Sequence, residues 1–354
     1  MVRSICVIPT HDLKMLKRWV DKWFCQKGNV MGDDVAVYVV FDGCEEKPYF
    51  FDKLPKGSKF FNENDVNNTL RSDAWIIPKK SSSCRHFGYL KAFQEWKKNK
   101  EIEMIFTIDH DCFPMIGTTN FSKEHYDILF NSDNVENAWF RTTSHATRGE
   151  PYETFERESQ CILNHGLWEN IPDFDAPQRM VFLRDKDLYN HSSYTWPDTI
   201  IPKGKFFAMC GMNLSWKPEW TPTMFFGLQG PSFPFNRFDD IWAGLMVKKI
   251  ADHFNLSIHT GSPAVWHERV SGLMYSFENE TNGIVVNEVL WKRFDDLILP
   301  KTSSNISQDE KYAECVSYIS ESVYGVMAKE GFKYGDYWMN LYYAHQLWLE
   351  ALYE

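Results

Sequence analysis

The chain has 354 residues, of which 44% are hydrophobic and 24% charged, a composition typical of one large or two smaller globular domains. Its formal net charge of −10 argues against a general affinity for nucleic-acid backbones, because such binding needs a basic surface. No stretch approaches the roughly 20 apolar residues needed to cross a bilayer, and the first residues lack a secretory signal. The eight cysteines are scattered without a CxxC pair, so we expect a cytoplasmic protein with reduced, mostly buried thiols.

The first third of the chain alternates between short apolar runs and helical patterns. Strands are predicted at 4–10, 35–43, 74–78 and 104–109, and helices at 12–24 and 84–99. This alternation is typical of a parallel sheet covered by helices. In such sheets ligands bind at the carboxyl ends of the strands, which is where Asp42 and Asp109 are expected to lie.

The rest of the chain combines loops with further helices. Residues 140–235 are rich in aromatic residues, proline and glycine, a composition that suits the walls of a pocket. A helix is predicted at 241–254, a strand at 257–267, and two more helices at 308–331 and 334–354. The last helix carries a dense aromatic stripe, which indicates core packing or the subunit interface of a homo-oligomer.

The run "FTIDHDCF" (106–113) places two aspartates at the end of a buried strand. Side chains alternate between faces along an extended segment, so Asp109 and Asp111 are expected to point the same way. Their repulsion can be relieved by a proton or by a divalent cation, and oxygen ligands favour Mg²⁺ or Mn²⁺. By itself the pattern is equally typical of a solvated turn, and Asp42 on the same edge of the sheet favours the binding site.

Two later segments add candidates to this site. Asp239 and Asp240 precede a helix, where acidic residues also serve as ordinary capping groups. His267 follows an apolar strand, and a lone histidine there is more often structural. A third ligand from a distant segment would nevertheless complete a metal site built on Asp109 and Asp111.

A series of longer motifs follows along the chain: "IPTHDLKMLKRW" (8–19), "SCRHFGY" (83–89), "FTIDHDCF" (106–113), "HGLWENIPDFDAP" (165–177) and "IPKGKFFAMCGMNLSW" (201–216). In these motifs the chain resembles the reversibly glycosylated polypeptide family, whose plant members are UDP-arabinopyranose mutases. The resemblance covers most of the chain to about residue 270. It implies an α/β fold of the glycosyltransferase-A-like type, with a mixed, mainly parallel sheet flanked by helices and followed by C-terminal helices. We expect a nucleotide-sugar domain at 1–300 and a helical extension at 301–354.

The resemblance also implies a UDP-sugar substrate and a divalent cofactor, Mn²⁺ or Mg²⁺. Asp109 and Asp111 match the family's acidic triplet, which would hold ribose and metal, and His110 stands in place of its middle aspartate. The segment "YETFERE" (152–158) resembles the one that carries a reversibly glycosylated arginine, so Arg157 is the matching residue. A guanidinium is a poor nucleophile, so this arginine would need a nearby carboxylate and a dry site.

The leading hypothesis is a mutase that interconverts the six- and five-membered rings of UDP-arabinose. Metal-bound diphosphate would leave the anomeric carbon, the sugar would be captured transiently, and the ring would open and reclose before UDP returns. Asp239 or Asp240 would orient sugar hydroxyls or act as the base.

The remaining candidates would bind the nucleotide sugar. Asp42 and His110 are assigned to the nucleotide, and Arg85 and Lys203 to phosphate or sugar. Three aromatic residues are candidates for an apolar sugar wall, although each alone is more often part of a core: Trp168, Phe174 and Trp242.

Two alternatives remain open. The same donor site would serve a glycosyltransferase that passes the sugar to an external acceptor, such as a glycan, a protein or a modified DNA base. A DNA acceptor would require a local basic groove despite the net charge of −10. The other alternative is a non-catalytic partner subunit that binds UDP-sugar, for which metal ligands would be superfluous.

Overall fold

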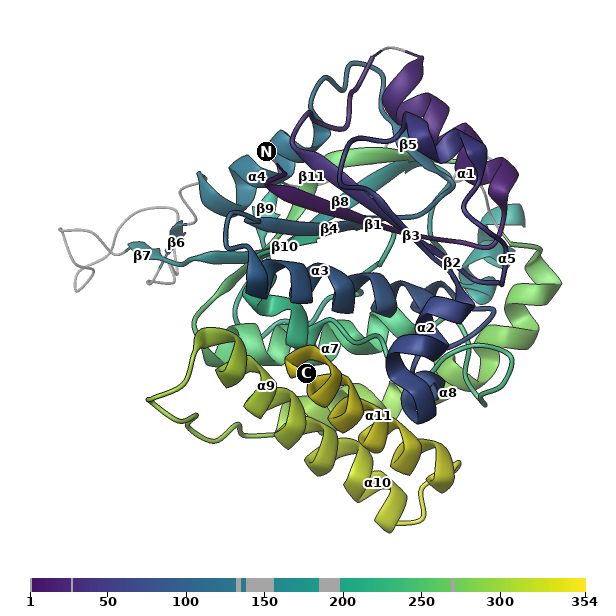
Figure 1. Ribbon diagram of the computed structural model, residues 1–354. Helices are drawn as coiled ribbons and strands as arrows, with labels where there is room; N and C mark the ends of the chain where they lie inside the picture. Colours follow the sequence, from purple (N-terminus) through teal and green to yellow (C-terminus); the bar gives the residue numbers. More distant parts are fainter. Residues whose placement is uncertain (1, 27, 132–134, 138–155, 185–197, 269–270) are drawn as a thin grey trace.

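The computed structural model describes residues 2–26, 28–131, 135–137, 156–184, 198–268 and 271–354. One large mixed sheet runs through the molecule, with helices on both faces and a group of C-terminal helices below it in Figure 1. From edge to edge the strands follow the order β3-β2-β1-β4-β10-β8-β11-β5, and β9 pairs with β11. None of the helices in these ranges has the length and apolarity that a membrane crossing requires.

The parallel half of the sheet comes from the N-terminal part of the chain. Its strands and covering helices are β1 (Ser4–Thr10), α1 (Leu13–Val20), β2 (Val35–Phe41), β3 (Lys59–Phe61), α2 (Glu63–Leu70), α3 (His86–Lys98) and β4 (Met104–Ile108). Side chains alternate along β1, so Ile5 and Val7 join the core on the α3 side, whereas Cys6 and Ile8 join the core on the α1 side. The parallel sheet covered by helices is therefore as predicted.

The other half of the sheet is mixed, with antiparallel neighbours at β4–β10, β10–β8 and β11–β5. Its strands are β5 (Cys112–Pro114), β8 (Cys161–Asn170), β9 (Thr199–Ile200), β10 (Asn213–Trp216) and β11 (Ser257–His267). Strand β10 is antiparallel to both β4 and β8, so β8 and its parallel neighbour β11 run in the same direction as β4. The carboxyl ends of β1, β2, β4, β8 and β11 therefore share one edge of the sheet. We call this edge the rim; it is formed by the residues at and after Thr10, Phe41, Ile108, Asn170 and His267.

The remaining helices are α4 (Phe121–Phe130), α5 (Ala176–Arg184), α7 (Asp239–His253), α8 (Leu273–Asp296), α9 (Gln308–Ile319), α10 (Val326–Lys329) and α11 (Gly335–Tyr353). Short 3-10 helices lie at Tyr49–Lys53, Arg71–Ile76, Ser82–Arg85 and Pro218–Thr223, and π-helical turns at Asp21–Cys25 and Ser320–Gly325. A separate two-stranded sheet pairs β6 (Val135–Asn137) with β7 (Glu156–Glu158). The predicted fold class, an α/β mixed sheet flanked by helices and followed by C-terminal helices, is confirmed.

Several elements differ from the prediction. The described part of 140–235, expected as loops, contains β8, α5, β9 and β10, and the prediction also lacked α2 and α4. The strand predicted at 74–78 is instead the end of the 3-10 helix Arg71–Ile76, because a short buried apolar run fits a strand and a helical turn equally well. Helix α8 is absent from the prediction because the buried face of its first half is polar or small, consisting of Ser276, Glu280 and Gly283. Hydrophobic periodicity therefore gave no signal for that half of α8.

The aromatic stripe of α11 belongs to the core of the chain itself. Trp338, Leu341 and Trp348 are buried, and the indole N–H of Trp348 donates to the carbonyl of Pro222 at 3.1 Å. The ring of Trp348 also contacts that of His86 at the start of α3. Core packing accounts for the stripe, so the hypothesis of a homo-oligomer through α11 loses its sequence support. The domain boundary predicted at residue 300 falls between α8 and α9 and stays a prediction.

His345 on α11 provides a test of this packing. Its ring contacts Phe225, its Nδ1 bonds to the Leu341 carbonyl at 2.8 Å, and burial lowers its pKa to about 4. In the unfolded chain a histidine has a pKa of about 6.5, so as the pH falls the unfolded chain binds a proton before the folded chain does. The neutral, buried imidazole therefore contributes to stability fully above about pH 6.5, and this contribution is lost as the pH falls toward 4.

The substitution His345→Gln is expected to remove the contribution of this imidazole to the pH dependence of stability. The slope of unfolding free energy against pH should flatten by about 1.4 kcal/mol per pH unit between about pH 4.5 and 6. Urea titrations across that range measure the slope. An unchanged slope would mean that the imidazole is not held neutral in the folded chain.

Candidate active site

Polar residues follow the ends of three parallel strands at the rim. His11 follows β1, Asp42 follows β2, and Asp109 and His110 follow β4. The rings of His11 and His110 lie 5.4 Å apart in an edge-to-face arrangement, and Asp42 accepts a hydrogen bond from the Ser81 backbone N–H at 3.2 Å. Burial raises the pKa of Asp42, and the backbone N–H groups that donate to it oppose this shift. The direction of the sheet therefore brings these groups to one place, as the strand pattern predicts.

Arg85 is buried next to Asp109, with only 2% of its side chain exposed. It ends the 3-10 helix Ser82–Arg85 and pairs with Asp109 Oδ1 at 2.5 Å. Its other N–H groups donate to the Gly211 carbonyl, to Thr107 Oγ1 at 3.3 Å and to the Ser82 carbonyl at 2.9 Å. The N–H groups of Arg85 are thus bonded within the protein and fix the position of Asp109, whereas the sequence suggested a direct contact with phosphate or sugar.

The acid pair Asp239-Asp240 begins α7 and lies close to Arg85. Asp239 accepts hydrogen bonds from Ser83 Oγ at 2.7 Å and Ser82 Oγ at 3.1 Å. Asp240 accepts from the Gly211 backbone N–H at 2.7 Å. Burial, followed by the negative charges of Asp239 and Asp173, raises the pKa of Asp240 well above its usual range. A carboxyl group held this way can carry a proton near neutral pH, as a general acid or base requires.

The segment Cys210-Gly211 is fixed between these groups. The Cys210 N–H donates to His165 Nε2 at 3.1 Å, and its thiol donates to Asp173 Oδ2 at 3.2 Å. A Cβ on Gly211 would lie 3.0 Å from the Phe226 ring and 3.3 Å from Arg85, so a larger residue would press on both. Burial raises the pKa of the Cys210 thiol, as do the neighbouring carboxylates, which keeps the sulfur protonated.

Asp111 directly precedes β5 and lies near His267, the last residue of β11, which pairs with β5. His267 pairs with Cys112 in the register, and the Glu268 N–H donates to the Asp111 carbonyl at 3.1 Å. Burial, followed by the charge of Asp109, raises the pKa of the Asp111 carboxyl, and the nearby His267 opposes that shift. His267 Nδ1 bonds to the Ile171 carbonyl at 2.9 Å, which leaves the lone pair on Nε2.

This arrangement suits two ligands of a divalent cation. An ionised Asp111 needs a nearby positive charge, and a histidine fixed through Nδ1 is the usual form of a metal-binding imidazole. Among the described residues, however, no group of three or more His, Cys, Asp or Glu side chains has the arrangement of a metal site. The remaining ligands would then come from phosphate oxygens and water, as is common for Mg²⁺ and its relatives.

Comparison with known proteins places the chain in a family. The sequence model described as "Reversibly glycosylated polypeptide" matches residues 34–350. The chain belongs to the reversibly glycosylated polypeptide family. UDP-arabinopyranose mutase 3 of Arabidopsis thaliana is 33% identical, and UDP-arabinopyranose mutase 1 of Oryza sativa subsp. japonica is 32% identical, each over 98% of this chain and 89% of its own length.

A mannosyltransferase from Pyrobaculum calidifontis, solved in complex with GDP-Man and Mn²⁺, has a TM-score of 0.45 and 10% identity, covering 98% of this chain and 85% of its own. A likeness at that level carries no argument. The family match, in contrast, extends through α9 and most of α11. The family match therefore reaches about 80 residues beyond residue 270, the limit to which the sequence motifs extend.

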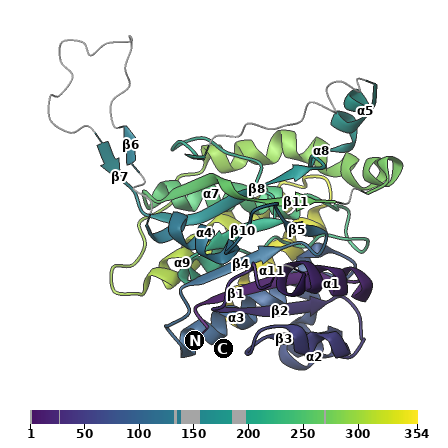
Figure 2. The same cartoon turned by 90° about the horizontal axis from the view of Figure 1, so that it is seen from above.

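Arg157 lies on β7, only a few residues before β8 begins. Because β8 runs in the same direction as β4, the start of β8 lies at the edge of the sheet opposite the rim. Figures 1 and 2 agree in showing β6 and β7 projecting from that opposite side. The structure does not bring the backbone of Arg157 to the other candidates, and its side chain is outside the described part of this family member.

Lys203 and Trp242 are likewise away from the rim. Lys203 follows β9, which pairs with the first half of β11, and its Nζ donates to Asn255 Oδ1 near the end of α7. Trp242 is buried among Phe235 and Trp338, so it belongs to the core. The sheet direction and the packing of α7 decide these positions, and neither can be read from single residues.

Two of the aromatic candidates stay near the rim. Trp168 is partly buried near the carboxyl end of β8, with its ring 6.1 Å from that of His165. Phe174 follows Asp173, the partner of Cys210, and is also partly buried. Sequence reasoning missed His165, Asp173 and Cys210, although the motifs "HGLWENIPDFDAP" and "MCGMNL" contained them.

Proposed function

We propose that the protein is a UDP-pentose mutase that interconverts the pyranose and furanose forms of UDP-arabinose. Its family and the printed names of its relatives support this reaction. The observation that carries the proposal is that the buried Arg85 lies close to two acidic groups: Asp109, with its neighbour Asp111, and Asp239, with its neighbour Asp240. Asp109 and Asp111 suit the binding of a cation and a diphosphate. Asp239 and Asp240 suit the transfer of a proton between sugar oxygens.

Asp111 and His267 would hold a divalent cation, Mn²⁺ or Mg²⁺, and Arg85 keeps Asp109 beside them. When bound, the cation neutralises the diphosphate, which makes UDP a better leaving group. Asp42, at the end of β2, would accept a hydrogen bond from the nucleoside. His110 would lie beside the nucleotide, and Trp168 would cover an apolar face of the sugar.

Ring exchange needs one proton to change place. The pyranose is closed by the oxygen on C5 and the furanose by the oxygen on C4, so the proton on one of these oxygens must pass to the other. Asp240, whose pKa is raised by burial and by its acidic neighbours, would take and return this proton. Asp239, fixed by Ser82 and Ser83, would orient the sugar hydroxyls.

The experiment is to incubate the purified protein with UDP-arabinopyranose and Mn²⁺ and to separate the nucleotide sugars by chromatography. Appearance of the furanose form supports the mutase. Loss of the sugar only when a glycan, protein or modified DNA acceptor is added would support a glycosyltransferase instead. Binding without any turnover would support the non-catalytic partner subunit. A chelator should stop the mutase reaction, and added Mn²⁺ should restore it.

Covalent capture of the sugar by Arg157 is a separate proposal. Intact-mass measurement after incubation with the nucleotide sugar would detect a pentose on the chain, and Arg157→Lys should remove it. Mutase activity that survives in this variant would mean that another group captures the sugar, in keeping with the backbone position of β7 away from the rim.

A further inference from the structure

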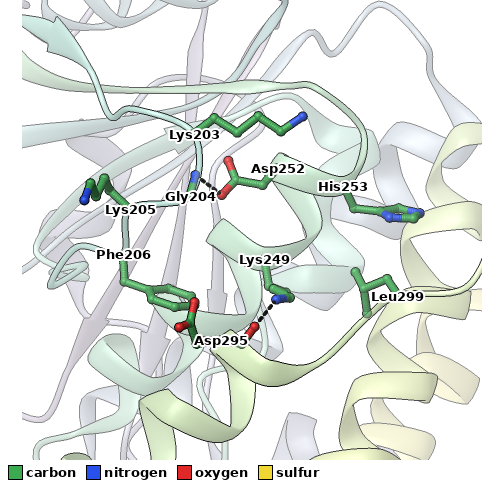
Figure 3. Close-up of a pocket in the computed structure, with 9 residues that line it drawn as sticks. All are labelled: Lys203, Gly204, Lys205, Phe206, Lys249, Asp252, His253, Asp295 and Leu299. Atoms are coloured by element: carbon green, nitrogen blue, oxygen red, sulfur yellow. Dashed lines mark hydrogen bonds between the residues drawn. The ribbon is translucent and has the colours of Figure 1, made fainter.

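Residues 204–211 run along α7 toward the rim. The Gly204 N–H donates to Asp252 Oδ2 at 3.0 Å near the end of α7, as Figure 3 shows, and the Gly211 N–H donates to Asp240 Oδ2 at 2.7 Å in its first turn. About 18 Å separates these two aspartates along the helix axis, and the chain between the two glycines can extend to about 25 Å. Segment 204–211 is therefore held to α7 at both of its ends.

Between these ends the segment lies against both α7 and the sheet. A Cβ on Gly244, in the middle of α7, would lie 2.6 Å from the Met209 Cβ, so the backbones of the helix and the segment approach closely. On the side of the sheet, the Phe207 ring lies 5.4 Å from the ring of His165, and His165 Nε2 accepts the Cys210 N–H at 3.1 Å. The side chain of His165 thus links β8 to the backbone of the segment close to its rim end.

The imidazole of His165 is held in one orientation. Because Nε2 accepts a backbone N–H, Nδ1 carries the hydrogen and donates to Thr260 Oγ1 at 3.0 Å, on the residue that pairs with His165 in β11. The side chain is buried, and burial lowers the pKa of His165 to about 4. The ring is therefore neutral at neutral pH, and Nε2 keeps the lone pair that accepts the Cys210 N–H.

We propose that His165 is a positioning residue, which holds the Cys210 N–H so that the next N–H along the chain, that of Gly211, stays on Asp240. Three successive hydrogen bonds carry this proposal: the Cys210 N–H to His165, the Gly211 N–H to Asp240, and Arg85 to the Gly211 carbonyl. Without His165 the buried Cys210 N–H would lack an acceptor, and the peptide would move to find one. The proposal rests on the mutase function only for the role of Asp240 as proton carrier.

Two substitutions separate the roles of the two ring nitrogens. In His165→Gln the side-chain oxygen can reach the place of Nε2 and accept the Cys210 N–H. In His165→Asn the amide nitrogen reaches only the place of Nδ1, so the bond to Thr260 is kept and the Cys210 N–H loses its acceptor. If the ring only fills space in the core, both variants should have similar effects, whereas the positioning role predicts that His165→Asn alone alters Asp240.

The first measurement is the titration of the Asp240 carboxyl, followed by NMR on the full chain with labelled aspartate and without substrate. The variant Asp240→Asn identifies its signal. The Gly211 N–H stabilises the ionised carboxyl, so the pKa of Asp240 should rise by about one unit in His165→Asn and stay near the wild-type value in His165→Gln. The other titratable or charged groups around this carboxyl are the same in both variants: Asp173, Asp239, Arg85 and the thiol of Cys210.

The second measurement is turnover of UDP-arabinopyranose. His165→Asn should lower kcat about 10- to 100-fold with little change in KM, and the ionisation seen in the pH profile of kcat should move with the pKa of Asp240. Val316→Ala, which truncates a core side chain of α9, is the control for lost stability: it should lower Tm and leave the pKa of Asp240 in place.

The outcomes separate this proposal from the proposed function. An unchanged pKa of Asp240 in His165→Asn, or equal changes in His165→Asn and His165→Gln, overturns the positioning role. Thr260→Val removes the partner of Nδ1 and should raise the pKa by a smaller amount, so it replaces His165→Asn if that variant does not fold. A wild-type chain without mutase turnover overturns the proposed function instead, and the titration of Asp240 then still decides the role of His165.

Discussion

The variant Asp111→Asn is expected to lose metal-dependent turnover by about 100-fold or more, while its folded structure stays intact. The carboxylate supplies the charge that a divalent cation needs, and the neutral amide does not. Burial and the charge of Asp109 raise the pKa of Asp111, so its ionised form opposes folding above the pKa of the unfolded chain. Removing that charge should leave Tm at neutral pH unchanged or slightly higher.

Two measurements separate this outcome from simple damage to the fold. Added Mn²⁺ should raise Tm of the wild-type chain through binding to the folded state, and this rise should disappear in Asp111→Asn. The exposed Asp52→Asn provides the matched control, with both the turnover and the Mn²⁺-dependent rise retained. Full activity in Asp111→Asn would remove the proposed cation from the rim.

Replacing Arg85 by methionine is expected to be the most destabilising of the changes considered, at about 3–5 kcal/mol. The guanidinium is 2% exposed and is the cation next to Asp109 and Asp239. Its loss leaves these carboxylates, and the carbonyl of Gly211, without a charged donor. The destabilisation should grow as the pH rises above the carboxylate pKa values, because more negative charge is then left uncompensated. Urea unfolding at about pH 5 and pH 8 measures both effects.

Arg85→Lys distinguishes charge from geometry. Lysine keeps the positive charge but cannot reproduce the planar fork that reaches Asp109, Thr107 and Gly211 together, so stability should recover only in part. The control is Arg293→Met, which breaks an exposed pair with Glu330 and should cost less than about 1 kcal/mol. If Arg85→Met lowers the free energy of unfolding by as little as the control does, the proposal that Arg85 stabilises the neighbouring carboxylates is wrong.

The parallel half of the fold could be predicted from the sequence because its information is local. Apolar runs alternating with helical patterns indicate parallel strands, and parallel strands bring their carboxyl ends to one edge. Asp42 and Asp109 therefore reach the rim by a rule that needs no long-range contact. His267 also reaches the rim, but through long-range pairing, because β11 is parallel to β8 and β10 lies antiparallel between β8 and β4.

Other parts of the site depend on pairings that no local pattern contains. The role of Arg85 depends on Gly211, which is 126 residues away, and that contact arises because β10 inserts antiparallel between β4 and β8. Because of the same insertion, β8 begins at the edge of the sheet opposite the rim. The backbone of Arg157, a few residues before β8, is therefore at that opposite edge. Lys203 has the residue type of a phosphate contact, but β9 carries it to the far end of α7.

The contact between α11 and the start of α3 has a consequence for how the protein is made. His86, the neighbour of Arg85, rests its ring against Trp348 and accepts the Phe226 N–H at 2.8 Å. A ribosome synthesises His86 early, yet the tryptophan that packs against it is made more than 250 residues later. Nascent chains therefore carry every acidic residue of the rim before α11 exists, and the packing of α11 against the start of α3 can form only once translation reaches α11.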